Sequence, residues 1–266
     1  LMAIVLPSPL ISHAQGIDQN TRRLYLPALY GSPAPAHPAC PATGANYETI
    51  PVLPPRTDRP AAQHADLNLA LRGWSYTTAF LALVEIAGDT HSDPPQLRGL
   101  FADHRTPVFT SAAQVYDWNW ACGPDGCRGL PLTSPPVTLL GLATRPGEQV
   151  RSPARAASIY AGGYIALVLH AEERRITLKY TREDNVIHGY TVHLEGVCLD
   201  PALLALYRQA DAAGRAQLPA LRNDQPLGLV IPLVLYHGPE AWTGPRTLEE
   251  LIAVPPPLDA YVPRLS

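Results

Sequence analysis

Two tryptophans lie two positions apart in the stretch Asp117–Trp118–Asn119–Trp120. In an extended strand, positions i and i+2 face the same side, so both indole rings would share one face. An aromatic face beside an amide and a carboxylate can stack on sugar rings. A glycan-binding surface at Trp118 and Trp120 is therefore one interpretation of the pattern, although the alternative that follows is the one we favour. The alternative is a buried aromatic pair that packs beside the loop at Cys122.

Three histidines, His170, His188 and His193, flank one predicted hairpin, and they would form a metal candidate if the sheet register brought them together. The turn at 183–185 (Glu-Asp-Asn) is typical of a polar hairpin turn, with calcium binding as the alternative. The sequence has no Gly-x-Ser-x-Gly elbow, no Walker-type phosphate loop and no His-Glu-x-x-His pair. No motif of those nucleotide-binding or hydrolytic classes is therefore present.

The chain has four cysteines, of which Cys122 and Cys127 enclose the turn-forming sequence Gly-Pro-Asp-Gly. This spacing predicts a small disulfide-closed loop. A zinc site on the same pair would need a second Cys or His pair at ligand spacing, and none is present. Cys40 and Cys198 could also pair, but sequence alone does not fix the connectivity.

The charge balance argues against a nucleic-acid partner. The 266 residues contain 20 Lys and Arg against 23 Asp and Glu, for a formal net charge of −3. A protein that binds nucleic acid through bulk charge needs a basic surplus to displace counterions. Hydrophobic residues make up 46% of the chain, which is enough for one good-sized core. No apolar stretch is long enough to span a membrane as a helix.

Short strands must position these residues. Apolar, β-branched runs separated by Gly, Pro and Asp predict a mainly β fold with an antiparallel, β-sandwich-like core. One helix is expected after Asp200, which can cap it, with Pro201 in its first turn. A capping box predicts a second helix from Thr247. The strands are expected at 79–86, 113–120, 136–142, 163–170, 175–181 and 189–196.

The first 60 residues predict export and a tether. Residues 1–14 combine an apolar run with Ser-His-Ala-Gln, which fits the end of a secretory signal peptide; a short buried strand is the alternative. Residues 15–60 are rich in proline and are typical of an extended linker. We therefore expect a secreted or cell-envelope protein.

Two short patterns in the middle of the chain occur in a familiar order. The first is His64-Ala-Asp-Leu-Asn68, and the second is Tyr190-Thr-Val-His193-Leu. With them, residues 61–228 resemble a divergent lysostaphin-type (LytM-like) zinc metallopeptidase domain, a family that cuts peptide cross-links in bacterial cell walls. The resemblance implies a compact antiparallel β fold, His193 as a catalytic residue, His64 and Asn68 as metal positions, zinc as the cofactor and peptidoglycan as the partner.

The matching stretches also depart from that family. Asn68 is a neutral amide where the family has an anionic aspartate, so a zinc ion there would lose charge compensation. The family's final His-x-His does not occur anywhere in the chain. We therefore expect an impaired or missing zinc site, and an inactive scaffold or wall-binding module in place of a working peptidase. The other hypothesis for this region is a secreted, non-enzymatic glycan-binding module that uses Trp118 and Trp120.

The run at 230–239 (VIPLVLYHGP) is followed by Trp242 and by Pro-Arg-Thr-Leu at 245–248. With these residues, 229–266 resemble a segment of Rpn-type recombination-promoting nucleases, also described as transposases. Metal-dependent DNA cleavage needs clustered carboxylates, and no such set can be assigned upstream of this segment. We therefore expect a non-catalytic tail, joined to the rest by a genuine fusion or by a chimeric reading frame. A nuclease or transposase fragment is the third functional hypothesis.

Overall fold

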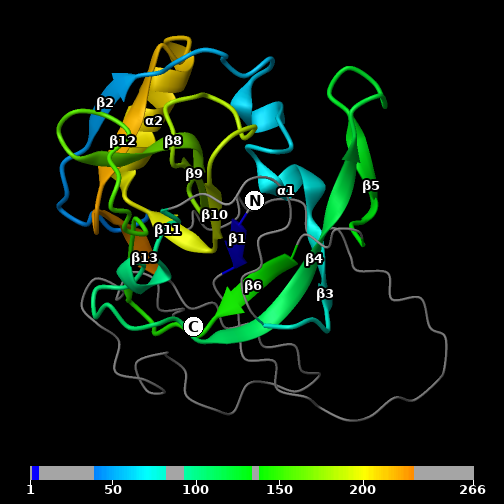
Figure 1. Cartoon of the computed structure of the whole chain (residues 1–266), viewed down its shortest axis with the longest axis horizontal. Helices are drawn as coiled ribbons and strands as arrows, with labels where there is room; N and C mark the ends of the chain where they lie inside the picture. The colour runs from blue at the N-terminus through cyan, green and yellow to red at the C-terminus, as the bar shows by residue number, and fades with distance from the viewer. Residues whose placement is uncertain (1, 6–38, 82–92, 134–137, 231–266) are drawn as a thin grey trace, which may run out of the picture.

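The computed structural model describes residues 2–5, 39–81, 93–133 and 138–230 (Figure 1). This part of the chain is mainly antiparallel β-structure with two α-helices, which confirms the predicted fold class. The large sheet contains β1 (Met2–Val5), β2 (Glu48–Pro51), β3 (Trp74–Thr77), β4 (Phe109–Asn119), β5 (Cys127–Pro131), β6 (Thr138–Leu142), β8 (Tyr164–Glu172), β9 (Arg175–Lys179), β10 (Thr191–Glu195) and β12 (Gln217–Arg222). The small sheet contains β7 (Gln149–Arg151), β11 (Val197–Leu199) and β13 (Pro226–Val230). The helices are α1 (Leu69–Arg72) and α2 (Pro201–Ala212), with 3-10 turns η1 (Ala61–Gln63) and η2 (Leu97–Gly99).

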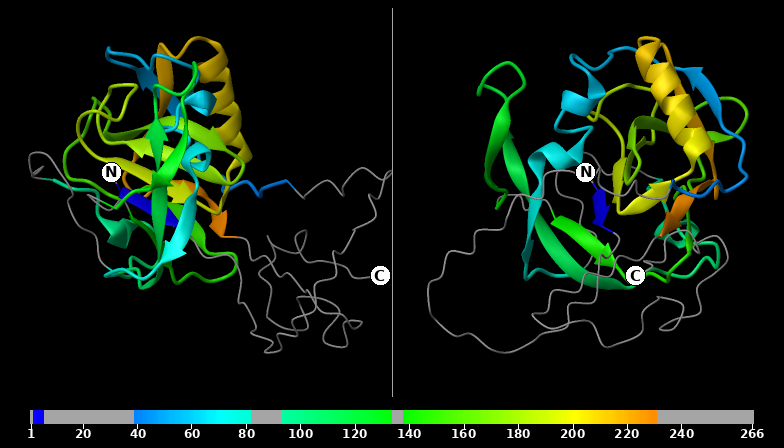
Figure 2. Two further views of the ribbon diagram at one scale, coloured as in Figure 1. Left: turned by 90° about the vertical axis from the view of Figure 1, so that its right-hand side faces the viewer. Right: turned by 180° about the vertical axis from the view of Figure 1, so that it is seen from behind.

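The large sheet runs in the order β2-β12-β8-β9-β10-β1-β6-β4-β3, with β5 also paired to β4. Strand β1 lies between β10 and β6 and is parallel to both, pairing Ala3 with His193 and with Leu139 (Figure 1). Residues 2–5 fall inside the predicted signal-peptide remnant, so here the structure follows the alternative, a short strand. The β4–β5 hairpin extends from one side of the molecule, and α2 packs on the other against β12 and β8 (Figure 2).

The centre of the core is β8, whose residues from Tyr164 to Ala171 are all buried. A continuous apolar run is typical of a strand covered on both faces. Helix α2 supplies part of that cover through Leu203, Leu204 and Tyr207. It begins as predicted: the Asp200 carboxylate accepts a hydrogen bond from the N–H of Ala202 at 2.7 Å.

Five of the six predicted strands are present with shifted bounds, as β4, β6, β8, β9 and β10. The prediction of a strand at 79–86 is wrong for residues 79–81, which have no strand structure; residues 82–86 lie outside the described residues. The strand of this region is β3 instead. Trp74 pairs with Val115 of β4 and packs against a small buried cluster that includes Val115. Residues 74–77 therefore make the sheet contacts that were predicted for residues 79–86.

The second half of the predicted linker belongs to the domain. Strand β2 pairs with β12, matching Ile50 with Leu218, and Cys40 forms a disulfide with Cys198. The backbone N–H of Thr43 donates to the Asp200 carboxylate at 2.6 Å. Proline is tolerated at residue 51 because β2 is the last strand of the sheet order and its outer side needs no ladder partner. The expectation of a free tether through residue 60 is therefore wrong for residues 39–60.

The predicted boundary between residues 228 and 229 falls inside strand β13. Leu229 pairs with Cys198, and Val230 pairs with Val197. The domain therefore continues to at least residue 230. Residues 231–266, with the second predicted helix and the Rpn-like pattern, lie outside the described residues. Neither described helix is long and apolar enough to cross a membrane.

Candidate functional site

One cleft gathers aromatic, aliphatic and charged side chains from four separate segments. It has a volume of about 460 Å³. Its lining comes from residues 55–59, from His64 and Asp66 after η1, from Trp120 at the end of β4, and from residues 185–187 between β9 and β10. The lining is mostly polar and charged, and its apolar members are Pro55, Trp120, Val186 and Ile187. Two predicted site residues, His64 and Trp120, meet in it.

His64 offers the cleft an N–H donor beside a carboxylate. Its Nδ1 accepts a hydrogen bond from the backbone N–H of Asp66 at 3.2 Å, which leaves the proton of the neutral ring on Nε2. That Nε2 lies 3.7 Å from Oδ1 of Asp58. Partial burial of the ring lowers the pKa of His64 from its ordinary value of 6.5, so the imidazole is neutral at neutral pH. A ligand would therefore meet one donor and one acceptor side by side.

The indole of Trp120 contacts two neighbouring side chains of the cleft. The guanidinium of Arg59 lies 4.6 Å from the centroid of the indole, and the His64 ring lies 5.0 Å from it. Arg59 is itself fixed by a two-pronged hydrogen bond to Asp58, at 3.0 and 2.9 Å. Trp120 remains 38% exposed. Its position is therefore set before any ligand arrives, while part of its surface stays open.

The β4–β5 hairpin positions that indole. The predicted disulfide between Cys122 and Cys127 is present and closes the hairpin loop. Trp118 donates its indole N–H to the backbone oxygen of Asp125 at 3.1 Å and meets Trp120 edge to face at 6.2 Å. Gly126 has a φ of +81°, and a Cβ there would lie 2.3 Å from the Trp118 indole nitrogen, so only glycine fits. Trp118 thus supports the cleft from the hairpin and is outside its lining.

The predicted metal position Asn68 is occupied by structural hydrogen bonds. Its side chain caps α1 by accepting from the N–H of Ala70, and it also accepts from Arg175 at 3.2 Å. Its amide nitrogen donates to Ala62 and to the Glu172 carboxylate. The side chain is 6% exposed. Among the described residues, the side chain of Asn68 therefore shares no hydrogen-bond partner with the side chain of His64.

The predicted catalytic residue His193 is buried, with 1% of its surface exposed. Its Nδ1 lies 3.0 Å from the Thr177 hydroxyl, which donates in turn to the backbone oxygen of Leu67 at 2.6 Å. Nδ1 therefore carries the proton, and Nε2 has no hydrogen-bond partner among the described residues. Within the described residues, no hydrogen bond, ion pair or ring contact joins His193 to His64 or to the cleft lining.

The other histidines also have separate partners. His170 contacts the Glu172 carboxylate at 3.2 Å and the Tyr207 hydroxyl at 3.4 Å, while His188 is exposed. Within the part of the chain that the structure describes, no set of three or more His, Cys, Asp or Glu side chains is arranged to hold a metal ion. The turn at 183–185 forms instead around Asp184, which is buried against Arg215.

The burial of two neighbours on β10 predicts an unusual pH dependence of stability. Burial lowers the pKa of His193 to about 3 and raises the pKa of Glu195 to about 7. Below pH 6.5 the His193 imidazole is protonated in the unfolded chain but stays neutral in the native state, so the free energy of unfolding falls on acidification. Between pH 4.5 and 7 the native state keeps a proton on Glu195 that the unfolded chain releases, so stability falls as pH rises.

We expect replacement of either group to change the slope of stability against pH, with opposite signs. From pH 7 to pH 5, His193→Gln should gain about 2 kcal/mol relative to the wild-type chain, and Glu195→Gln should lose about 2 kcal/mol. Urea unfolding at the two pH values measures both differences. His188→Gln, at an exposed position, is the control and should follow the wild type. Parallel curves for all four proteins would contradict the expectation.

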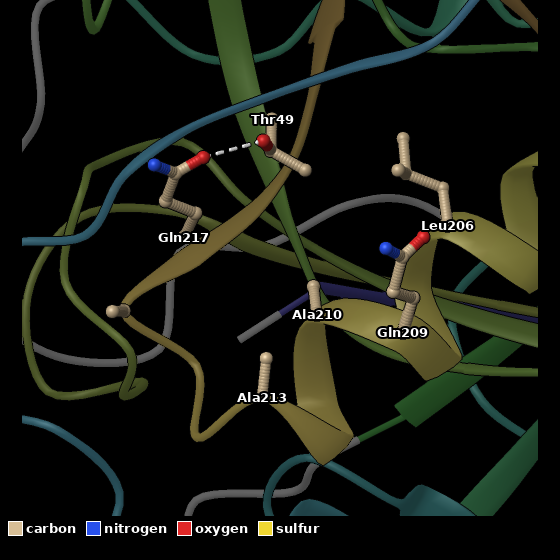
Figure 3. Close-up of a pocket in the computed structure, with 7 residues that line it drawn as sticks. Thr49, Leu206, Gln209, Ala210, Ala213 and Gln217 are labelled. Atoms are coloured by element: carbon tan, nitrogen blue, oxygen red, sulfur yellow. Dashed lines mark hydrogen bonds between the residues drawn. The ribbon is translucent and has the colours of Figure 1, made fainter.

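A second hollow, of about 330 Å³, lies between α2 and the edge formed by β2 and β12 (Figure 3). Thr49 donates there to the side-chain oxygen of Gln217 at 2.7 Å, and Ala210, Ala213 and Gln209 form the opposite side. Its lining contains no ionisable group. This hollow has no acid, base or charged side chain to act on a ligand. We therefore take the cleft at His64 as the candidate site.

The sequence did not single out Asp58, Arg59, Val186 or Ile187, although all four line the cleft. Asp58 and Arg59 fall in the predicted linker, and the two aliphatic residues fall between the predicted polar turn at 183–185 and the strand predicted from residue 189. Asp58-Arg59 is a charged pair and Val186-Ile187 is an aliphatic pair, and neither pair belongs to a sequence motif that would have marked it as part of a site. Comparison of the chain with family models, curated proteins and solved structures finds no match.

Proposed function

We propose that this chain is an exported, disulfide-stabilised β domain that binds a glycan, with cell-wall peptidoglycan as the natural source, and that it acts as a binding module without a catalytic metal. The observation that carries the proposal is the convergence of the open Trp120 indole with the paired donor and acceptor of His64 and Asp58. Two disulfides fit an oxidising compartment outside the cytosol.

The chemistry of the cleft matches a sugar ring. The C–H groups of a pyranose face are weakly polarised and pack on an indole, while neighbouring hydroxyls are spaced to accept from one group and donate to the next. The His64 N–H and the Asp58 carboxylate, 3.7 Å apart, provide such a donor and acceptor.

The proposal leaves His193 and Asn68 without a functional task. A catalytic histidine must reach its substrate, and His193 is buried away from the cleft. Asn68 holds α1 and Arg175 in place. These residues support the fold beneath the site, as the absence of the family's aspartate and His-x-His from the sequence would lead one to expect.

Loss of the indole is expected to weaken glycan binding strongly. Trp120→Ala should lower the affinity for soluble wall-glycan oligosaccharides at least tenfold, or about 1.4 kcal/mol, because it removes the stacking surface. Isothermal titration calorimetry on the whole chain measures this. Tyr76→Ala is the matched control: it removes another exposed aromatic, 72% accessible on β3, and should leave binding unchanged.

A chelator separates the proposed function from a zinc-dependent one. Binding that is unaffected by EDTA agrees with a module that holds no metal. An oligosaccharide panel that shows no binding, or a Trp120→Ala chain that binds like the wild type, would overturn the proposal.

A further inference from the structure

One side of the cleft is an aliphatic wall. Val186 and Ile187 line it together with Pro55, and Ile187 is 70% exposed. A sugar that carries only hydroxyl groups would leave the wall without an apolar partner. The wall therefore calls for a ligand with a small apolar substituent.

The wall is built before a ligand binds. Asn185 donates its side-chain amide to the backbone oxygen of Pro55 at 3.1 Å, and it accepts from the N–H of Ile187 at 3.0 Å. The first bond ties the β9–β10 loop to the segment before η1, and the second fixes the loop backbone at Ile187. Preorganisation of this kind reduces the ordering cost of binding, so the contact with Ile187 can contribute to selectivity.

The residue next to Pro55 supplies a polar complement. Arg56 lines the same cleft, and one of its N–H groups donates to the backbone oxygen of Gly214 at 3.2 Å. A guanidinium has five N–H donors, so others remain for a ligand. Arg59 on the same segment is already paired with Asp58, and Asp66 also lines the cleft, so the lining carries no surplus of positive charge. The remaining N–H groups of Arg56 can donate to a carbonyl oxygen of a ligand.

We propose that the cleft selects glycans with N-acetylated amino sugars, the acetamido methyl packing on Val186 and Ile187 and the acetamido oxygen accepting from Arg56. An acetamido group is apolar at its end and polar at its base, as the two sides of the cleft require. This inference rests on the proposed function, because it names the ligand class of the same cleft.

The test compares three tetrasaccharides that share the same β-1,4 backbone. Calorimetry on the whole chain should give the tightest binding for the N-acetylglucosamine tetramer, and at least tenfold weaker binding for the glucose tetramer and for the deacetylated glucosamine tetramer, which both lack the acetamido group. Ile187→Ser should lower the affinity for the acetylated tetramer toward that of the glucose tetramer and leave the latter unchanged. Val108→Ser, at a 62% exposed position outside the lining, is the matched control and should change neither.

The outcomes distinguish this inference from the proposed function. Equal affinity for the acetylated and glucose tetramers, with both lost in Trp120→Ala, would overturn the acetamido inference and leave glycan binding standing. An equal loss for both tetramers in Ile187→Ser would also overturn it. Failure of all three sugars to bind would overturn both proposals.

Discussion

Replacing Cys40 and Cys198 together by serine is expected to lower the free energy of unfolding by about 5 kcal/mol. The disulfide joins residues 158 positions apart, so it removes a large amount of conformational entropy from the unfolded chain. In the native state it fixes the segment before β2 to strand β11, where Cys198 is fully buried. A loss of this size is comparable with the whole stability of a small domain.

The second disulfide supplies a matched control. Cys122 and Cys127 are 5 positions apart, and the same loop-closure relation gives about 2 kcal/mol for their removal. Urea unfolding of the two double-serine variants, both under oxidising conditions, measures the difference. The Cys122/Cys127 variant should also weaken glycan binding, because the closed loop positions Trp120. A Cys40/Cys198 variant as stable as the wild type would contradict the expected effect.

The two disulfides also show what a sequence can and cannot predict. The Cys122–Cys127 loop is local, and its Gly-Pro-Asp-Gly turn announces it. Pairing of Cys40 with Cys198 depends on β2 joining the sheet edge at β12 and on β11 following β10. Those are contacts between distant segments, which composition and spacing do not encode.

The same division holds for the strands. Strand β8 begins with an apolar run from Tyr164 to Leu169 and was predicted almost to its ends. Strand β2 (Glu-Thr-Ile-Pro) and strand β12 (Gln-Leu-Pro-Ala-Leu-Arg) contain proline and lack a clear alternation. They are strands because each has a neighbour in the sheet, and tertiary pairing overrides weak local preference.

Two residues of the candidate cleft were singled out from the sequence, but their meeting in one place was not predicted. Trp120 was singled out as an aromatic surface, and His64 was singled out through a family resemblance. Their meeting depends on the β4–β5 hairpin reaching the turn after η1, which no local pattern describes. Asp58 was hidden because proline-rich surroundings suggested a tether, although the segment is held by a network that includes Arg59.

The charged turn at 183–185 leads to the last prediction. Asp184 is completely buried, and its carboxylate accepts from Nε of Arg215 at 2.7 Å and from Nη2 of the same residue. Asp184→Ala should lower the free energy of unfolding by about 3–5 kcal/mol, because it leaves a guanidinium buried without its main counter-ion. Urea unfolding at pH 7 measures the loss.

Two variants test whether that loss arises from the buried charge. Asp211→Ala removes the more exposed partner of Arg215 and should cost about 1 kcal/mol or less. In the double variant Asp184→Leu/Arg215→Met both charges disappear, and most of the stability should return, since a buried ion pair is worth little more than an apolar pair of similar volume. A double variant no more stable than Asp184→Ala would show that packing of the turn is the larger contribution. Asn185 to Ile187, which line the cleft, follow Asp184 directly in the chain. Asp184→Ala should therefore also weaken glycan binding, and the double variant should restore the affinity together with the stability.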